Sequence, residues 1–257
     1  MVEFIYGRNA VCETLKAGRR ELLGLQVADG VKPTGRVEEI MQLAARAKIP
    51  ATLVPRLKLD NLGTNHQGVA LEVGDYPYSS LLEILDLATE KKQPPFVLLI
   101  DALQDPQNFG TLLRTAEACG VHGVIIPRAR AVGVTPAVVN ASSGASEHLL
   151  IAQSNLSQAM DALKEADTWL VGLDTQAEPV DDKVSRHLAG AIGLVVGSEG
   201  GGLHDLTRKK CDLVLSLPMR GRVESLNAAV AGSVALYLAF LARERKGHEQ
   251  RPNRQSG

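Results

Sequence analysis

The sequence predicts an α/β protein with a small N-terminal α/β domain and a larger domain built on a mainly parallel sheet. From residue 96 onward, short apolar runs alternate with helical patterns, and strands interleaved with helices give a parallel sheet covered on both faces. The first run, FVLLID at 96–101, is apolar almost throughout, as a strand buried on both faces requires. The break QPP at 93–95 disfavours helix and separates this region from the preceding one.

Residues 1–75 are predicted to form the small N-terminal α/β domain. ELLGLQVA at 21–28 and GVALEV at 68–73 have the pattern of strands, and VEEIMQLAARAK at 37–48 has the apolar spacing of an amphipathic helix. Residues 76–94 are predicted to be a linker with a helix of its own, in LLEILDLATEKK.

Residues 95–242 are predicted to form the larger domain. Its helices are expected near 108–119 and 155–166, and its strands at 96–101, 123–127, 148–152, 169–173, 192–197 and 212–218. The last helix is expected to begin at Ser225 and is apolar on more than one face, so it must be buried against the sheet or another subunit. The tail 243–257 has no apolar period and is predicted to be disordered.

The composition is that of a soluble globular protein, with 45% apolar and 22% charged residues among 257. A net charge of −1 and only 4% aromatic residues mean that RNA binding would need a local patch. Three cysteines without a CxxC pair and six scattered histidines predict neither a disulfide framework nor a metal site. Without a signal-peptide pattern or a membrane-length apolar run, the expected location is the cytoplasm.

The first polar loop follows the strand that ends at Asp101. A helix is expected to start near Asn108, and Arg114 and Glu117 then share one of its faces. One interpretation is a surface ion pair between these two side chains. The other is a functional role for Arg114, because a guanidinium within an otherwise apolar helix needs an anionic partner.

The second polar loop is GSEGGG at 197–202, after the apolar run 192–196. It matches neither the dinucleotide fingerprint nor the phosphate-binding P-loop. The carboxylate of Glu199 would repel a phosphate, so the loop favours a cationic or hydroxyl-bearing ligand.

The third polar loop lies in LSLPMRGRVESLNAAVAGS at 215–233, where Ser225 is expected to cap the last helix. The free N–H groups at the start of that helix could bind a ligand, or the segment could be a capped helix and nothing more.

Taken together and in this order, NFGTLLRTAEACG, VVGSEGGGL and LPMRGRVESLNAAVA resemble the three motifs of the SpoU (TrmH) family of RNA ribose 2′-O-methyltransferases. The resemblance covers about 96–242, and YGRNAVCETLKAG and NHQGVALEV look like the family's N-terminal RNA-binding domain. It implies a SPOUT-type parallel sheet with a C-terminal trefoil knot and S-adenosylmethionine as the methyl donor. It also implies a homodimer through the knot domain and the last helix. The domain combination is similar to the branch that methylates a guanosine of 23S rRNA.

The resemblance also implies roles for individual residues. The cofactor would lie against Gly197, Leu217, Met219 and Leu226, with the two leucines flanking the adenine. Arg114 would be essential for catalysis, and the site would be arranged by Asn108, Glu199, Ser225 and Asn227. No metal is implied.

Several of these roles have alternatives. Arg114 would act as a base or as a clamp on an RNA phosphate. The base role would require a neutral arginine near pH 8, which would cost roughly 7 kcal/mol. Glu199 would orient Asn108 or Arg114, or it would accept backbone N–H bonds that shape its loop. Asn227, expected just inside the last helix, would contact the cofactor or cap the helix.

Three other functions compete with the rRNA assignment. A tRNA ribose 2′-O-methyltransferase would use the same motifs, although such enzymes generally lack the N-terminal domain. A non-catalytic RNA-binding ribosome-assembly protein would be free to lose Asn108, Arg114, Glu199, Ser225 and Asn227, which are all present. An NAD-dependent enzyme would need the dinucleotide fingerprint, which is missing.

Overall fold

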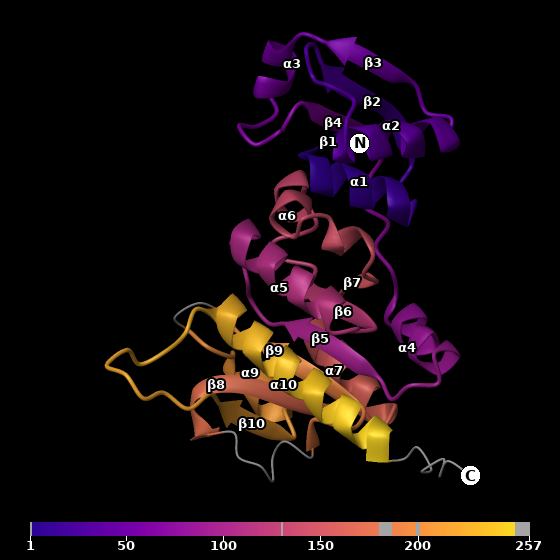
Figure 1. Ribbon diagram of the computed structural model, residues 1–257. Helices are drawn as coiled ribbons and strands as arrows, with labels where there is room; N and C mark the ends of the chain where they lie inside the picture. The colour runs from indigo at the N-terminus through magenta and orange to yellow at the C-terminus, as the bar shows by residue number, and fades with distance from the viewer. Residues whose placement is uncertain (1, 130, 180–186, 199–200, 250–257) are drawn as a thin grey trace, which may run out of the picture. The chain divides into compact units, whose positions relative to one another are not determined.

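The computed structural model describes residues 2–129, 131–179, 187–198 and 201–249 (Figure 1). The chain divides into two compact units. The first consists of residues 1–78, 105–117 and 132–149, and the second of residues 79–104, 118–131 and 150–257. Two segments that the sequence expectation placed in the larger domain, 105–117 and 132–149, therefore pack with the small N-terminal sheet.

The first unit contains a four-stranded sheet in the order β1-β4-β2-β3. β4 runs antiparallel to β1 and β2, and β2 runs parallel to β3. The strands are β1 (Glu3–Tyr6), β2 (Leu22–Ala28), β3 (Ala51–Val54) and β4 (Val69–Val73), and the helices are α1 (Arg8–Ala17), α2 (Arg36–Arg46) and α3 (Arg56–Asp60). The strands and helix predicted from the pattern of residues 1–75 match β2, β4 and α2 to within two residues.

The same unit contains α5 (Pro106–Ala118), α6 (Pro136–Ala141) and a short 3-10 helix, η1 (Ala145–Glu147). α5 and α6 pack closely at Gly110, where an added Cβ would lie 2.5 Å from the Ala141 Cβ, so only glycine fits. The Asn140 side-chain amide donates to the Tyr6 carbonyl at 2.9 Å and ties α6 to β1. Residues 148–150, predicted to start a strand, instead follow η1.

The second unit contains a six-stranded sheet in the order β10-β8-β9-β5-β6-β7, and all of its neighbouring strands are parallel. The predicted α/β architecture with a parallel sheet is thereby confirmed. The strands are β5 (Phe96–Ile100), β6 (Gly123–Pro127), β7 (Ile151–Ser154), β8 (Trp169–Pro179), β9 (Ile192–Val196) and β10 (Leu213–Ser216). β5 and β9 are buried at every residue, which explains why both sequences are apolar runs.

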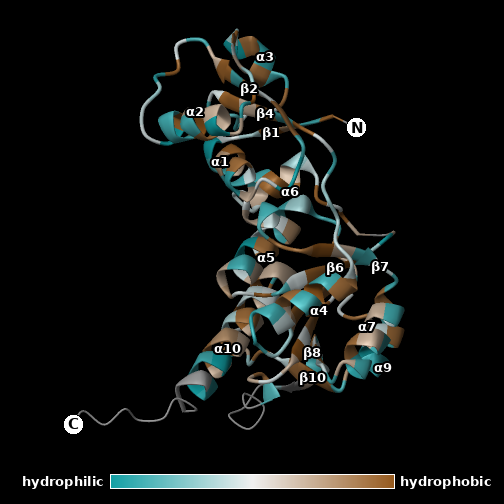
Figure 2. Ribbon diagram, turned by 90° about the vertical axis from the view of Figure 1, so that its right-hand side faces the viewer, coloured by the Kyte–Doolittle hydropathy of each residue, from teal (hydrophilic) through white to brown (hydrophobic). Residues whose placement is uncertain are grey.

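Helices cover both faces of this sheet. α4 (Leu81–Glu90), α7 (Leu156–Glu165) and α9 (Asp205–Lys210) lie on one face, and α10 (Ala228–Glu249) lies on the other (Figures 1 and 2). Ile84 of α4 and Leu163 of α7 belong to one buried cluster with the β5 residues Val97 and Leu99. α4 is the helix predicted within 76–94, and a capping box between Ser80 and Glu83 starts it.

The structure corrects both predicted ends of the last helix. α10 begins at Ala228, because the Asn227 side chain accepts from the backbone N–H groups of Ala229 (2.9 Å) and Val230 (3.2 Å). Asn227 is therefore the N-cap in place of Ser225. The helix continues to Glu249, so residues 243–249 of the predicted disordered tail are helical, and 250–257 lie outside the described residues.

Arg243 explains why the helix continues into the tail. Its guanidinium donates to the carbonyls of Gly190 and Pro94 and lies 5.0 Å from the centre of the Phe96 ring. These tertiary contacts stabilise a segment that has no apolar period of its own.

None of the helices in the described part of the chain combines the length and hydrophobicity needed to cross a bilayer. Within the same residues, no cluster of three or more His, Cys, Asp or Glu side chains could hold a metal ion.

Candidate functional site

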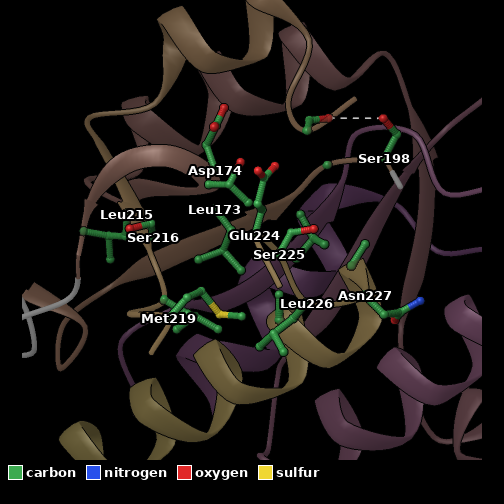
Figure 3. Close-up of a pocket in the computed structure, with 17 residues that line it drawn as sticks. Leu173, Asp174, Ser198, Leu215, Ser216, Met219, Glu224, Ser225, Leu226 and Asn227 are labelled. Atoms are coloured by element: carbon green, nitrogen blue, oxygen red, sulfur yellow. Dashed lines mark hydrogen bonds between the residues drawn. The ribbon is translucent and has the colours of Figure 1, made fainter. Parts of the chain in front are cut away.

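A cavity of about 360 Å³ opens in the second unit where β9 and β10 end and α10 begins, beside the middle of β8 (Figure 3). The carboxyl ends of parallel strands are where open α/β sheets usually bind ligands. Its volume suits a small molecule of nucleoside size. Its lining residues are Leu173, Asp174, Thr175, Val196, Gly197, Ser198, Gly202, Leu215, Ser216, Leu217, Met219, Glu224, Ser225, Leu226, Asn227, Ala228 and Ala231.

The structure brings most of the predicted site residues to this cavity. All four predicted cofactor neighbours line it, as do two residues predicted to arrange the site: Gly197, Leu217, Met219, Leu226, Ser225 and Asn227. Asn108 and Arg114 lie on α5, in the first unit. Glu199 lies outside the described residues.

Gly197 is a glycine because the loop closes on itself. An added Cβ would lie 2.3 Å from the carbonyl carbon and oxygen of Gly202, which no real side chain tolerates. The backbones of Ser198 and Gly202 exchange hydrogen bonds of 2.9 and 3.3 Å across this narrow turn, and Gly202 has φ +63°. The glycines therefore shape the cavity wall directly, before any ligand is considered.

Asp101 holds the far end of the same loop, a role that the sequence analysis missed. It lies just beyond the end of β5 and is buried, with 8% of its surface exposed. One carboxylate oxygen accepts from the His204 backbone N–H at 2.7 Å and lies 3.0 Å from His204 Nδ1, and the other accepts from Thr207 Oγ1 at 2.9 Å. The loop is thus fixed between β9 and Asp101.

Asp174 is a second residue that the sequence analysis missed, and it lines the cavity itself. Its carboxylate forms an ion pair with Arg208 and accepts from the Gln176 backbone N–H at 2.9 Å. The available signal was its place directly after the apolar run WLVGL, just as Asp101 follows FVLLI. Glu224 adds another carboxylate to the lining, so the cavity combines acidic groups with apolar side chains.

Arg114 lines a different cavity, of about 460 Å³, which lies wholly within the first unit. Its side chain is exposed, and Nη1 donates to Ser143 Oγ at 3.3 Å. The expectation of a guanidinium enclosed by apolar neighbours is wrong, because Arg114 points away from the buried face of α5. The predicted surface ion pair with Glu117 is also not formed between these two described side chains.

Asn108 stands in the first turn of α5. Its backbone N–H donates to Asp105 Oδ2 at 2.9 Å, so Asp105 caps the helix, which begins at Pro106, two residues earlier than expected. The turn is anchored by Phe109, which is fully buried.

Two family models match the chain. The SpoU rRNA Methylase family matches residues 95–237, and the RNA 2′-O ribose methyltransferase substrate binding domain matches residues 4–79. The Bacillus subtilis protein YacO, classed by its name in the TrmH family of tRNA/rRNA methyltransferases, is 40% identical over 247 residues. The match covers 95% of this chain and 98% of that protein.

Solved structures show the same fold. The SpoU methyltransferase AviRb from Streptomyces viridochromogenes, in complex with AdoMet, has a TM-score of 0.76 at 23% identity and covers 96% of this chain and 91% of its own. The AdoMet-bound rRNA methyltransferase from Sinorhizobium meliloti has a TM-score of 0.71 at 23% identity and covers 93% of this chain and 86% of its own.

Proposed function

Because the chain belongs to the SpoU rRNA methylase family, we propose that it transfers a methyl group from S-adenosylmethionine to a ribose 2′-hydroxyl of 23S rRNA, at a guanosine. The observation that carries this proposal is the cavity at the ends of β9 and β10, where residues of the second and third motifs meet. The segment 4–79, which matches a substrate-binding domain, would bind the RNA.

The cavity's chemistry fits S-adenosylmethionine. That molecule, when bound, supplies a methyl group activated by a positively charged sulfonium. The half-buried Leu217 and the exposed Leu226 offer apolar surface to an adenine, and Met219 extends it. Asp174 and Glu224 are carboxylates, which suit ribose hydroxyls and positive charge and would repel a phosphate. We expect the trefoil knot implied by the motifs to be formed by the segments that build this cavity.

Arg114 is proposed to be essential for the reaction as a clamp on an RNA phosphate. Its guanidinium is exposed and bonded to a neutral hydroxyl, so it can receive an anion. A phosphate beside it would stabilise the charged form, which argues against a role as a base. Asn108, Glu199, Ser225 and Asn227 are proposed to arrange the site, with Asn227 holding the start of α10 at the cavity.

The preference for rRNA over tRNA rests on the N-terminal domain. Residues 4–79 match a substrate-binding domain, and the match to the S. meliloti rRNA methyltransferase extends over 93% of the chain. Ribosomal RNA and the methyl donor both occur in the cytoplasm, which is the proposed location.

A homodimer is proposed from the free face of α10. Val230, Val234, Tyr237 and Leu241 recur every three or four residues, so they form one stripe along the helix, and each is 40% to 49% exposed. A second copy of this chain would cover the stripe. Val234→Glu should therefore give monomers in sedimentation equilibrium, while Lys209→Glu on α9 should leave the dimer intact.

The decisive experiment incubates the protein and S-adenosylmethionine with total rRNA and, separately, with tRNA, and maps new 2′-O-methyl groups by mass spectrometry. A new methyl on one 23S guanosine, absent with Arg114→Ala and kept with the matched surface variant Arg56→Ala, is the expected result. A methyl on tRNA would overturn the choice of substrate. Cofactor binding without methylation of any RNA would favour a ribosome-assembly role instead.

A further inference from the structure

The polar cavity of the first unit is lined by residues from two matched segments, the substrate-binding match at 4–79 and the methylase match at 95–237. Asn9 and Glu13 come from α1 and Arg36 from α2, all within the segment 4–79. The opposite wall comes from α5 and from the turn after α6, and it consists of Arg114, Glu117, Ser142, Ser143, Ala145 and His148. Groups from both parts of the sequence therefore face one space inside one compact unit.

The turn after α6 is rigid, and it directs the Ser143 hydroxyl toward Arg114. Ser143 has φ +54°, a left-handed conformation that costs a non-glycine residue about 1 kcal/mol or more. Gly144 follows with φ +89°, and an added Cβ there would lie 2.5 Å from the Glu13 Cβ, so the turn is pressed against α1. The buried Ser142 hydroxyl donates to the Val139 carbonyl at 3.0 Å and closes the turn from behind. Strain held in this way commonly marks a functional position.

The charges in the cavity are unevenly compensated. The Glu13 carboxylate lies 3.1 Å from Lys16 Nζ and 3.0 Å from His148 Nε2, and Arg36 lies 2.8 Å from Glu39. Partial burial opposes ionisation of Glu13, but the hydrogen bonds from His148 and Lys16 hold its pKa below the ordinary value. Arg114 bonds to the neutral Ser143. Among the described residues no carboxylate forms an ion pair with Arg114, whereas the Arg36 guanidinium is paired with Glu39.

We propose that this cavity receives a single unpaired nucleotide of the RNA, with Arg114 on its phosphate and with Asn9 and His148 on its base or ribose. This rests on the proposed function and adds two specific contacts to it. Proteins read RNA chiefly through unpaired nucleotides, which hydrogen-bond to side-chain amides and stack on histidine rings or guanidinium planes. Asn9 is exposed, His148 is the one ring among the lining residues, and the volume of about 460 Å³ lies in the range of small-ligand pockets.

The test measures RNA affinity and does not depend on methyl transfer. Full-length protein is titrated against radiolabelled 23S rRNA and tRNA transcripts in filter-binding assays, with Asn9→Ala, His148→Ala and Arg114→Ala beside the wild type. Each substitution should weaken binding of the preferred transcript about tenfold, the effect of one good hydrogen bond or stack. The control Arg56→Ala removes an exposed arginine of α3 in the same domain and should change affinity less than twofold.

A second readout separates a local effect from misfolding. The affinity for S-adenosylhomocysteine, measured by calorimetry, should stay within twofold of wild type in all four variants. With 4-thiouridine in the transcript, cross-links should map to the peptides that contain Asn9 or His148. The proposal is overturned if neither transcript binds, if Asn9→Ala and His148→Ala bind as Arg56→Ala does, or if all cross-links lie elsewhere. Failure of methyl transfer with these affinity changes present would overturn the proposed function alone.

Discussion

Arg20 and Glu147, which are 127 residues apart in the chain, form an ion pair in which both side chains are almost completely buried. Arg20 Nε donates to Glu147 Oε2 at 3.0 Å, and Nη2 donates to Oε1 at 3.1 Å. Arg20 Nη1 also contacts Glu3 at 2.8 Å, and its guanidinium lies 4.9 Å from the centre of the Tyr76 ring. The pair joins the small sheet to η1 inside the first unit, so these two parts should unfold together.

Glu147→Leu should therefore destabilise the protein strongly. It leaves the buried Arg20 charge with Glu3 as its one carboxylate partner among the described residues, and breaking a buried ion pair costs about 3 to 5 kcal/mol. The control Glu3→Gln alters the outer, 27% exposed partner and should cost less than about 1 kcal/mol in the free energy of unfolding. Urea titrations followed by circular dichroism measure both. If the two substitutions lower the free energy of unfolding equally, the buried pair contributes no more to stability than the pair between Arg20 and Glu3.

Ser143 is expected to position Arg114. Ser143→Ala and Ser143→Gly both remove the hydroxyl that accepts from Arg114 at 3.3 Å, and each should lower kcat/KM for RNA about tenfold, because a misplaced clamp weakens the hold on the RNA phosphate. Ser143→Gly should also raise the melting temperature above that of Ser143→Ala, because glycine adopts φ +54° without strain. Methyl-transfer kinetics and thermal melts of the same preparations test both statements. A wild-type kcat/KM for RNA in either variant would rule out the positioning role.

Asp101→Ala should weaken cofactor binding although Asp101 does not line the cavity. It removes the acceptor for the His204 backbone and Thr207 hydroxyl, and so frees the loop that begins at Gly197. We expect a loss of roughly tenfold or more in affinity for S-adenosylhomocysteine, with a smaller loss for Thr207→Val, which removes one of these bonds. Calorimetry gives both values. An unchanged affinity in Asp101→Ala would show that the loop holds its shape without this anchor.

His122 should make the protein less stable in mild acid. It is 1% exposed, accepts from the Phe96 backbone N–H at 3.0 Å and lies 3.0 Å from the Gln93 side chain. Burial, with a contribution from nearby Lys91 and Arg243, lowers its pKa to about 4. Because the folded pKa is below the unfolded value near 6.5, this stability is fully present above pH 6.5 and is lost as the pH falls toward 4.

The size of this effect is on the order of 3 kcal/mol between pH 7 and pH 4. Urea unfolding at several pH values should show it, and His122→Gln should flatten the slope between pH 6.5 and 4 after correction for the lower overall stability. If His122→Gln keeps the wild-type slope of stability against pH, the pH dependence arises from other titratable groups.

Local pattern was enough to predict β5, β9 and the helix in the linker. Each is encoded by neighbours a few residues apart, as in the apolar run of β9 or the helical pattern of LLEILDLATEKK. Gly197, Leu217 and Leu226 were singled out by the resemblance of their motifs to the SpoU family, and the structure places all three at the same cavity. The start of α10 was misplaced because Ser225 and Asn227 are equally good caps by type, and only the backbone geometry chooses between them.

Thus the sequence by itself determined the class of fold, the order of its elements and the motifs of the methyltransferase family. Only the tertiary structure decided that α5 packs with the N-terminal sheet, that Asp101 anchors the loop before His204, and that Arg20 is neutralised by Glu147. Periodicity and capping depend on contacts within a few residues, whereas the partner of a buried charge depends on which distant segments the folded chain brings within about 3 Å.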